Sequence, residues 1–225
     1  TDYADNTGDV STHEGRIYAN KPPGLAFTAV PVYFVLVQLE RRLDLDIDAP
    51  HVASANAHVL SFWSSGLPAM VLVLGLYWHF RRSGSSRREA FVLAFGFGLG
   101  TLGFPYSGAL VRHNLVAACL FMAWILIRDR EAFLGAGALL GLAALTEYLT
   151  IPLVGLTVVY GFWRSRARAP WLLAGPLVAG LVILACNAWA FGGPFQTAYT
   201  HMQDFKNEGL LLGMLHWPDL RRLYW

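Results

Sequence analysis

Long apolar runs alternate with short polar segments along most of this chain. The apolar runs cover residues 58–80, 89–105, 108–127, 131–146, 149–163 and 170–191. Runs of this kind are typical of helices that cross a bilayer, each of which needs roughly 20 residues. We therefore predict an all-α, polytopic integral membrane protein with about six transmembrane helices over residues 58–191.

The first part of the chain has a different pattern. Residues 1–20 are polar, as is typical of a loop outside the bilayer. The apolar run 25–39 is only about 15 residues long and is interrupted by Pro31, which predicts a helix too short to cross. We therefore predict that residues 1–57 form an extracytoplasmic loop with an interfacial, juxtamembrane helix over 25–39. A second extracytoplasmic loop is expected over residues 192–225.

Arginine placement gives the predicted helices an orientation. Short basic loops occupy residues 81–88, 128–130 and 164–168. Short loops rich in Lys and Arg stay on the cytoplasmic side, so all three are expected inside. The predicted spans then alternate without contradiction only if residues 25–39 do not cross. This places the helix over 25–39 on the outer face, together with the turns at 104–108 and 146–148.

Composition supports a membrane protein. Hydrophobic residues make up 55% of the 225 residues and charged residues only 14%, whereas soluble domains carry about a quarter charged residues. Cys119 and Cys186 lie inside apolar runs and indicate small core residues. Glycines at 96–103 and 135–141 indicate close helix packing. Because the chain begins without Met or a signal peptide and stops at Trp225 without a tail, we expect it to be a piece of a longer protein.

The strongest candidate for chemistry is Lys21, which precedes a double proline. The prolines fix the backbone and prevent an ordinary helix start, so Lys21 is expected at a set height beside the membrane surface. Its ammonium group suits a phosphate or pyrophosphate. The alternative is a lysine that marks the end of an interfacial helix.

Acidic residues near the start are candidates for a general base. Asp2, Asp5 and Asp9 fit that role, or one of them fits a divalent metal together with His13 or Glu14. The alternative is that they are solvated loop acids. No spacing typical of a zinc site, a Ser-His-Asp triad or a nucleic-acid-binding patch is present, so we assign no metal ligand and expect no nucleic-acid partner.

A polar triplet stands at the start of one predicted span. Arg112, His113 and Asn114 lie about one turn below its outer end, where such residues are costly and usually functional. The alternative is an arginine that reaches the interface. Glu147, in an outer turn, is expected to pair with Arg112, to reach the site, or to remain an exposed acid.

Two segments of this sequence resemble a known family. The run Gly15-Arg16-Ile17-Tyr18, followed by Asn20-Lys21-Pro22-Pro23-Gly24, resembles the G-x-x-Y-x-x-K-P-P signature of GT-C superfamily membrane glycosyltransferases. The branch it resembles most includes the dolichyl-phosphate-mannose–protein mannosyltransferases and the lipid A aminoarabinose transferase. Phe104-Pro105-Tyr106-Ser107, leading into Arg112, is similar to the next outer turn of that family.

The resemblance implies transfer of a sugar from a polyprenyl-phosphate donor to an acceptor on the outer face of a plasma membrane, here of the prokaryotic inner-membrane type. Membrane lipid, the lipid-linked sugar and an acceptor are the implied partners. No cofactor is certain, and a divalent metal stays open. Implied roles are catalysis for Asp2, Asp5 and His113, and binding of the lipid phosphate for Lys21, Arg112 and Tyr18, with Asp9, Asn114 and Glu147 as further candidates.

This chain departs from the family pattern at two places. The family base usually lies about 30 residues before the lysine, which is upstream of Thr1, and His113-Asn114 stand where a second acid is expected. Two alternatives therefore stay open: a transporter or flippase of a lipid-linked or anionic solute, and a non-catalytic membrane protein with the same fold. Ionisable residues near mid-span, which proton coupling would need, are almost absent.

Overall fold

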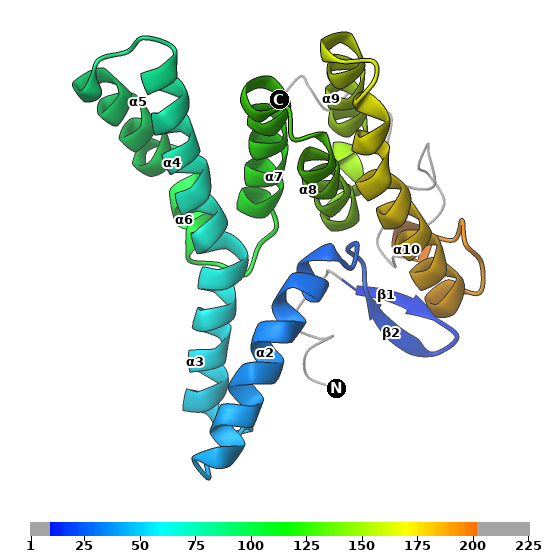
Figure 1. Cartoon of the computed structure of the whole chain (residues 1–225). Coiled ribbons are helices and arrows are strands. Elements are labelled where there is room, and N and C mark those ends of the chain that lie inside the picture. Colours follow the sequence, from blue (N-terminus) through cyan, green and yellow to red (C-terminus); the bar gives the residue numbers. More distant parts are fainter. Residues whose placement is uncertain (1–9, 202–225) are drawn as a thin grey trace, which may run out of the picture.

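The structure is a computed structural model, and it describes residues 10–201 (Figure 1). Its principal helices are α2 (Gly24–Arg42), α3 (Pro50–Ser61), α4 (Leu67–Arg82), α5 (Arg87–Gly100), α6 (Gly103–Ser107), α7 (His113–Ile125), α8 (Phe133–Thr146), α9 (Ile151–Arg164) and α10 (Ala174–Phe191). The π-helical segments η1 (Phe62–Gly66) and η2 (Leu126–Arg130) continue or join them, as do the 3₁₀ segments η3 (Tyr148–Thr150), η4 (Ala169–Leu173) and η5 (Ala198–His201). The described part of the chain is thus mostly helical, as predicted.

A small β-hairpin corrects the prediction of a purely helical protein. Strands β1 (Val10–His13) and β2 (Arg16–Ala19) pair antiparallel, with His13 opposite Arg16. The two residues between them, Glu14 and Gly15, have φ values of 48° and 74°. A two-residue turn with both values positive matches the right-handed twist of the strands. Part of the segment expected to be an irregular loop therefore has regular structure.

Within residues 10–201, three helices are long and apolar enough to cross a membrane. They cover Gly24–Arg42, the continuous helix Pro50–Arg82, and Ala169–Phe191. This finding indicates that the protein associates with a membrane. The other predicted spans correspond to shorter helices, such as the 14 residues of α8, so a total of about six crossings remains a prediction.

Two predicted boundaries are wrong. Helix α2 has 19 residues and contains Pro31 inside it, because a proline removes only one helical hydrogen bond and the helix continues beyond it. Its length therefore no longer excludes a crossing. The next helix begins at Pro50 rather than residue 58, and it runs for 33 residues through η1 to Arg82. Pro50 stands at the first helical turn, where a missing N–H costs nothing.

A closely packed part of the core lies where α8 meets η4 and α10. A Cβ on Gly137 would fall 2.7 Å from the carbonyl oxygen of Trp171. Gly141 and Gly175 have no room for a Cβ either, because each lies against the backbone of the opposite helix. Close packing through small residues is confirmed here. It is wrong for Gly96 and Gly100, which face open space.

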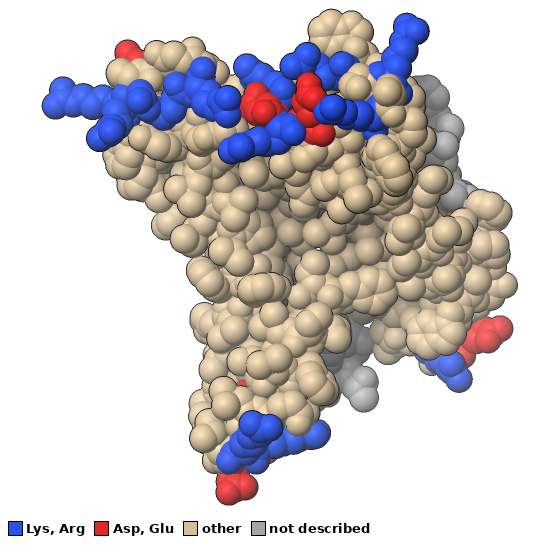
Figure 2. Space-filling view, viewed as in Figure 1, with Lys and Arg blue, Asp and Glu red and all other residues tan. Residues whose placement is uncertain are grey.

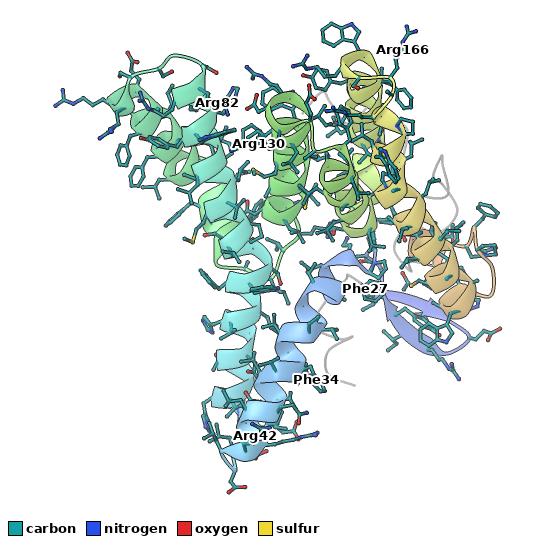
Figure 3. The ribbon with its side chains drawn as sticks, in the orientation of Figure 1. Phe27, Phe34, Arg42, Arg82, Arg130 and Arg166 are labelled. Carbon is teal, nitrogen blue, oxygen red and sulfur yellow. The ribbon has the colours of Figure 1, made fainter. Side chains whose placement is uncertain are left out.

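Charged side chains gather at the ends of the helical bundle, and a broad belt between them is nearly free of charge (Figure 2). Arg82, Arg130 and Arg166 lie at one end, and Arg42 lies at the far end (Figure 3). We call the first the basic end. The three basic loops lie together there, as the predicted alternation of spans requires. The other end of the core, where α8 finishes and α2 begins, is called the motif end (Figure 1).

Candidate functional site

The Lys-Pro-Pro-Gly corner is fixed against the end of α8. Strand β2 leads into Asn20, which is fully buried, and helix α2 begins at Gly24 directly after the two prolines. A Cβ on Gly24 would lie 2.5 Å from Oγ1 of Thr146 and 2.6 Å from the carbonyl carbon of Leu145. Only glycine therefore allows α2 to start so close to α8. Lys21 stands three residues before this contact, so its backbone position is set by it.

An ion pair lies just beyond the same helix end. Thr146 donates its hydroxyl to the carbonyl oxygen of Leu142 at 2.7 Å, and the backbone of Glu147 then turns to an extended conformation. The Glu147 carboxylate pairs with Nε of Arg112, the residue that precedes α7. Both side chains are largely buried, with 12% and 21% of their surfaces exposed. Of the three alternatives left open for Glu147, the structure therefore shows the pairing with Arg112 and not an exposed acid.

Glu147 keeps one acceptor position open. Its Oε2 accepts from Arg112, while Oε1 is buried and has no hydrogen-bond partner among the described residues. A buried carboxylate oxygen without a donor is costly. A hydroxyl or amine group of a bound molecule would satisfy it. The carboxylate is therefore suited to orienting a polar group of a substrate.

Two tyrosines connect Lys21 to this ion pair. The Nζ atom of Lys21 lies 6.0 Å from the centre of the Tyr199 ring, and that ring lies 6.0 Å from the ring of Tyr148. Tyr148 follows Glu147 directly in the chain. Burial raises the pKa of Tyr148 to about 12, with smaller contributions from the neighbouring Tyr199, Cys186 and Glu147. Its phenol therefore stays neutral at physiological pH.

The sequence did not point to Tyr199. It belongs to η5, far along the chain from Lys21, and no local pattern signals a contact over such a distance. Tyr148 had a weak signal, because it stands beside Glu147 in a short outer turn. Together, the motif-end cluster consists of Lys21, Arg112, Glu147, Tyr148 and Tyr199.

Three predicted residues have other surroundings. The ring of Tyr18 packs on α10, 5.3 Å from the ring of Phe191. Asn114 is buried and donates to Oγ of Ser65 at 3.2 Å and to the carbonyl oxygen of Gly103 at 3.0 Å, so it joins η1, α6 and α7. His113 is exposed, and its ring lies 5.0 Å from that of Tyr106.

The predicted base lies outside the described residues, since Asp2, Asp5 and Asp9 all precede residue 10. Within residues 10–201, no three His, Cys, Asp or Glu side chains come together as metal ligands do. His13 and His201 are a pair of neighbours, with ring centres 4.6 Å apart. A role for a divalent metal stays a prediction.

An apolar hollow adjoins the first turns of α2. It has a volume of about 390 Å³ and is bounded by residues of α2, η1, α4, α7 and α8, including Phe27, Pro31, Trp63, Leu67 and Met122. The indole N–H of Trp63 donates to the carbonyl oxygen of Thr28 at 3.0 Å, which holds the continuous helix against α2. An apolar chain therefore has a place to lie one to two helical turns along α2 from its start at Gly24.

Comparison of the chain with models of known families, with curated proteins and with solved structures found no match. The class that the fold defines is a mostly helical protein that, in the part the structure describes, has three helices suited to cross a membrane.

Proposed function

We propose that this protein is a membrane glycosyltransferase. It moves a sugar from a polyprenyl-phosphate donor to an acceptor on the extracytoplasmic face of a plasma membrane, of the prokaryotic inner-membrane type. One observation carries the proposal: Gly24 seats the lysine corner against α8, beside the pair of Arg112 and Glu147. A fixed cation, a guanidinium and a carboxylate with a free oxygen thus share one end of an apolar bundle.

The cation has a defined task in such a reaction. As the acceptor oxygen or nitrogen bonds to the anomeric carbon, the bond from that carbon to the phosphate oxygen breaks, and the polyprenyl phosphate leaves with the bonding electrons. Lys21 stabilises the negative charge that grows on the leaving phosphate. Arg112 gives Nε to Glu147, which leaves its two terminal amino groups for a phosphate oxygen.

Other residues of the protein suit the isoprenoid chain, the sugar hydroxyls and the acceptor proton. The isoprenoid chain lies in the apolar hollow beside α2. The unpartnered Oε1 of Glu147 accepts a hydrogen bond from a hydroxyl of the sugar or the acceptor. Asp2 or Asp5 removes the acceptor proton. In this arrangement α2 borders the hollow at the outer face, as the juxtamembrane helix of the proposal.

The proposed glycosyltransferase activity is tested by following a labelled sugar. Membranes containing the full chain are given a panel of radiolabelled polyprenyl-phosphate sugars, and label is measured in acceptor and lipid fractions. Label that moves to an acceptor, in amounts that depend on the protein, is the expected result. Proteoliposomes that move the intact labelled lipid between leaflets, without cleaving it, would show a flippase and overturn the proposal.

A further inference from the structure

The basic end contains an aromatic ring shared by two arginines from different helices. Trp78 and Arg82 lie one turn apart on α4, and the guanidinium carbon of Arg82 lies 4.8 Å from the centre of the Trp78 ring. The guanidinium carbon of Arg130, from η2, lies 5.6 Å from the centre of that ring. Figure 3 labels both arginines at this end of the molecule. One indole thus holds two positive charges near each other.

A second tryptophan repeats the arrangement on α7 and η2. The guanidinium carbon of Arg128 lies 4.9 Å from the ring centre of Trp124, again one helical turn away. His79 lies between the two units: its ring is 5.1 Å from that of Trp124, and its Nδ1 is 3.4 Å from Nη1 of Arg128. The arginine–tryptophan cluster consists of Trp78, His79, Arg82, Trp124, Arg128 and Arg130.

The arginines of this cluster are short of negative partners. Asp129 lies 3.6 Å from Arg128, but within residues 10–201 neither Arg82 nor Arg130 has a carboxylate within ion-pair distance. Both side chains are exposed. A guanidinium that lies over an aromatic ring keeps its N–H donors in its own plane, where they are free to bind a planar or tetrahedral anion.

The surroundings of the cluster identify the anion. Residues 81–89, 128–131 and 164–168 hold nine arginines against three acids, and Trp and Arg together are typical of the boundary of a membrane. On the other side of Trp124, an apolar hollow of about 440 Å³ lies between α7 and α9, bounded by residues that include Leu120, Leu156 and Tyr160. A site with cations above and an apolar hollow beside them fits a charged head with a hydrocarbon chain.

We propose that the arginine–tryptophan cluster binds the phosphate of an anionic phospholipid in the leaflet at the basic end, with an acyl chain in the hollow between α7 and α9. Basic pockets between membrane helices bind anionic head groups in this way. Cation–π contact holds the guanidinium groups in place before the lipid arrives, so less side-chain entropy is lost on binding. The proposal does not rest on glycosyl transfer at the motif end.

The test compares two variants with the same loss of charge. The full chain in detergent micelles is titrated with phosphatidylglycerol or phosphatidylcholine, and lipid-bound species are counted by native mass spectrometry. The double variant Arg82→Gln/Arg130→Gln is expected to bind phosphatidylglycerol roughly twenty-five-fold more weakly, at about fivefold for each arginine. The matched variant Arg87→Gln/Arg88→Gln, whose arginines lie on α5 outside the cluster, changes the affinity less than about twofold.

Three results would overturn the proposal. These are equal weakening in the two double variants, equal affinity of the unaltered protein for both lipids, and displacement of the lipid by soluble glycerol phosphate. Equal weakening would mean diffuse attraction rather than a site, and displacement would mean that the hollow contributes nothing. A second variant, Arg82→Lys/Arg130→Lys, keeps the charge but loses the planar fork. It should give intermediate affinity, and circular dichroism checks that every variant retains its helices.

Discussion

The motif end and the basic end of the core both carry arginine, but in different surroundings. At the motif end, Arg112 is largely buried and pairs with Glu147. At the basic end, Arg82 and Arg130 lie exposed over Trp78. The first arginine is fixed by a carboxylate beside a lysine corner, whereas the others are held by an aromatic face and keep their donors available. The comparison teaches that burial and partners, rather than residue type, determine what each arginine contributes.

The largest effect is expected from breaking the buried pair. Replacing Arg112 with Gln leaves the Glu147 carboxylate buried without a cation, which should lower the free energy of unfolding by about 3 kcal/mol. We take the lower end of the usual range because a fifth of Arg112 reaches solvent. Unfolding in mixed micelles with rising dodecyl sulfate measures the change. The double variant Arg112→Gln/Glu147→Gln should recover most of the loss. If it is no more stable than Arg112→Gln, the pair is not the cause.

Helix α8 runs from the basic end to the motif end and packs closely on α10, so a substitution at this contact tests the core that joins the two ends. Gly175 lies against the backbone of Gly137, with no room for a Cβ. Gly175→Val should lower the free energy of unfolding by about 2 kcal/mol, because the helices must separate. Gly180 is the matched control on α10, since a Cβ there meets open space. Equal effects of Gly175→Val and Gly180→Val would contradict the close contact.

A smaller effect is expected at the hairpin that leads to Lys21. The buried hydroxyl of Ser11 donates to the carbonyl oxygen of Ala198 at 2.7 Å, which ties β1 to η5 and so to Tyr199. Ser11→Ala should cost about 1 kcal/mol of unfolding free energy and should speed hydrogen exchange in both segments. Thr157→Ala is the control, because its hydroxyl bonds only within its own helix. Unchanged exchange in η5 would show that the hairpin does not hold it.

The smallest effect is expected from a single exposed arginine outside both clusters. Arg166→Gln, in the loop after α9, should change the unfolding free energy by less than about 0.5 kcal/mol. The same mixed-micelle titration measures it. A change as large as that of Arg112→Gln would mean that the basic end is stabilised by a buried network, and the contrast between the ends would fail.

The sequence predicted much of the helical pattern, because apolar runs and short basic loops are local signals. It also singled out the corner at Lys21, and it left the pairing of Glu147 with Arg112 open as one of three alternatives. It predicted a helix over residues 25–39 that is too short to cross, whereas α2 has 19 residues from Gly24 to Arg42, since the one hydrogen bond lost at Pro31 does not stop a helix that packs against neighbours. Contacts such as Tyr199 with Lys21 join distant segments. No sequence periodicity signals such a contact. The close approach of α8 to α10 could not be predicted either, apart from the glycines that permit it.

The central claim is that Lys21 stabilises the leaving phosphate at the motif end, and the most direct measurement is kcat/KM for sugar transfer in membranes. Lys21→Ala should lower it by about 10²–10³, the usual loss when one group that stabilises transition-state charge is removed. Arg16→Ala removes the same charge from the exposed face of the same hairpin and should leave kcat/KM nearly unchanged. Lys21→Arg should retain part of the activity. Equal activity in Lys21→Ala and Arg16→Ala, at matched expression, would contradict the assignment.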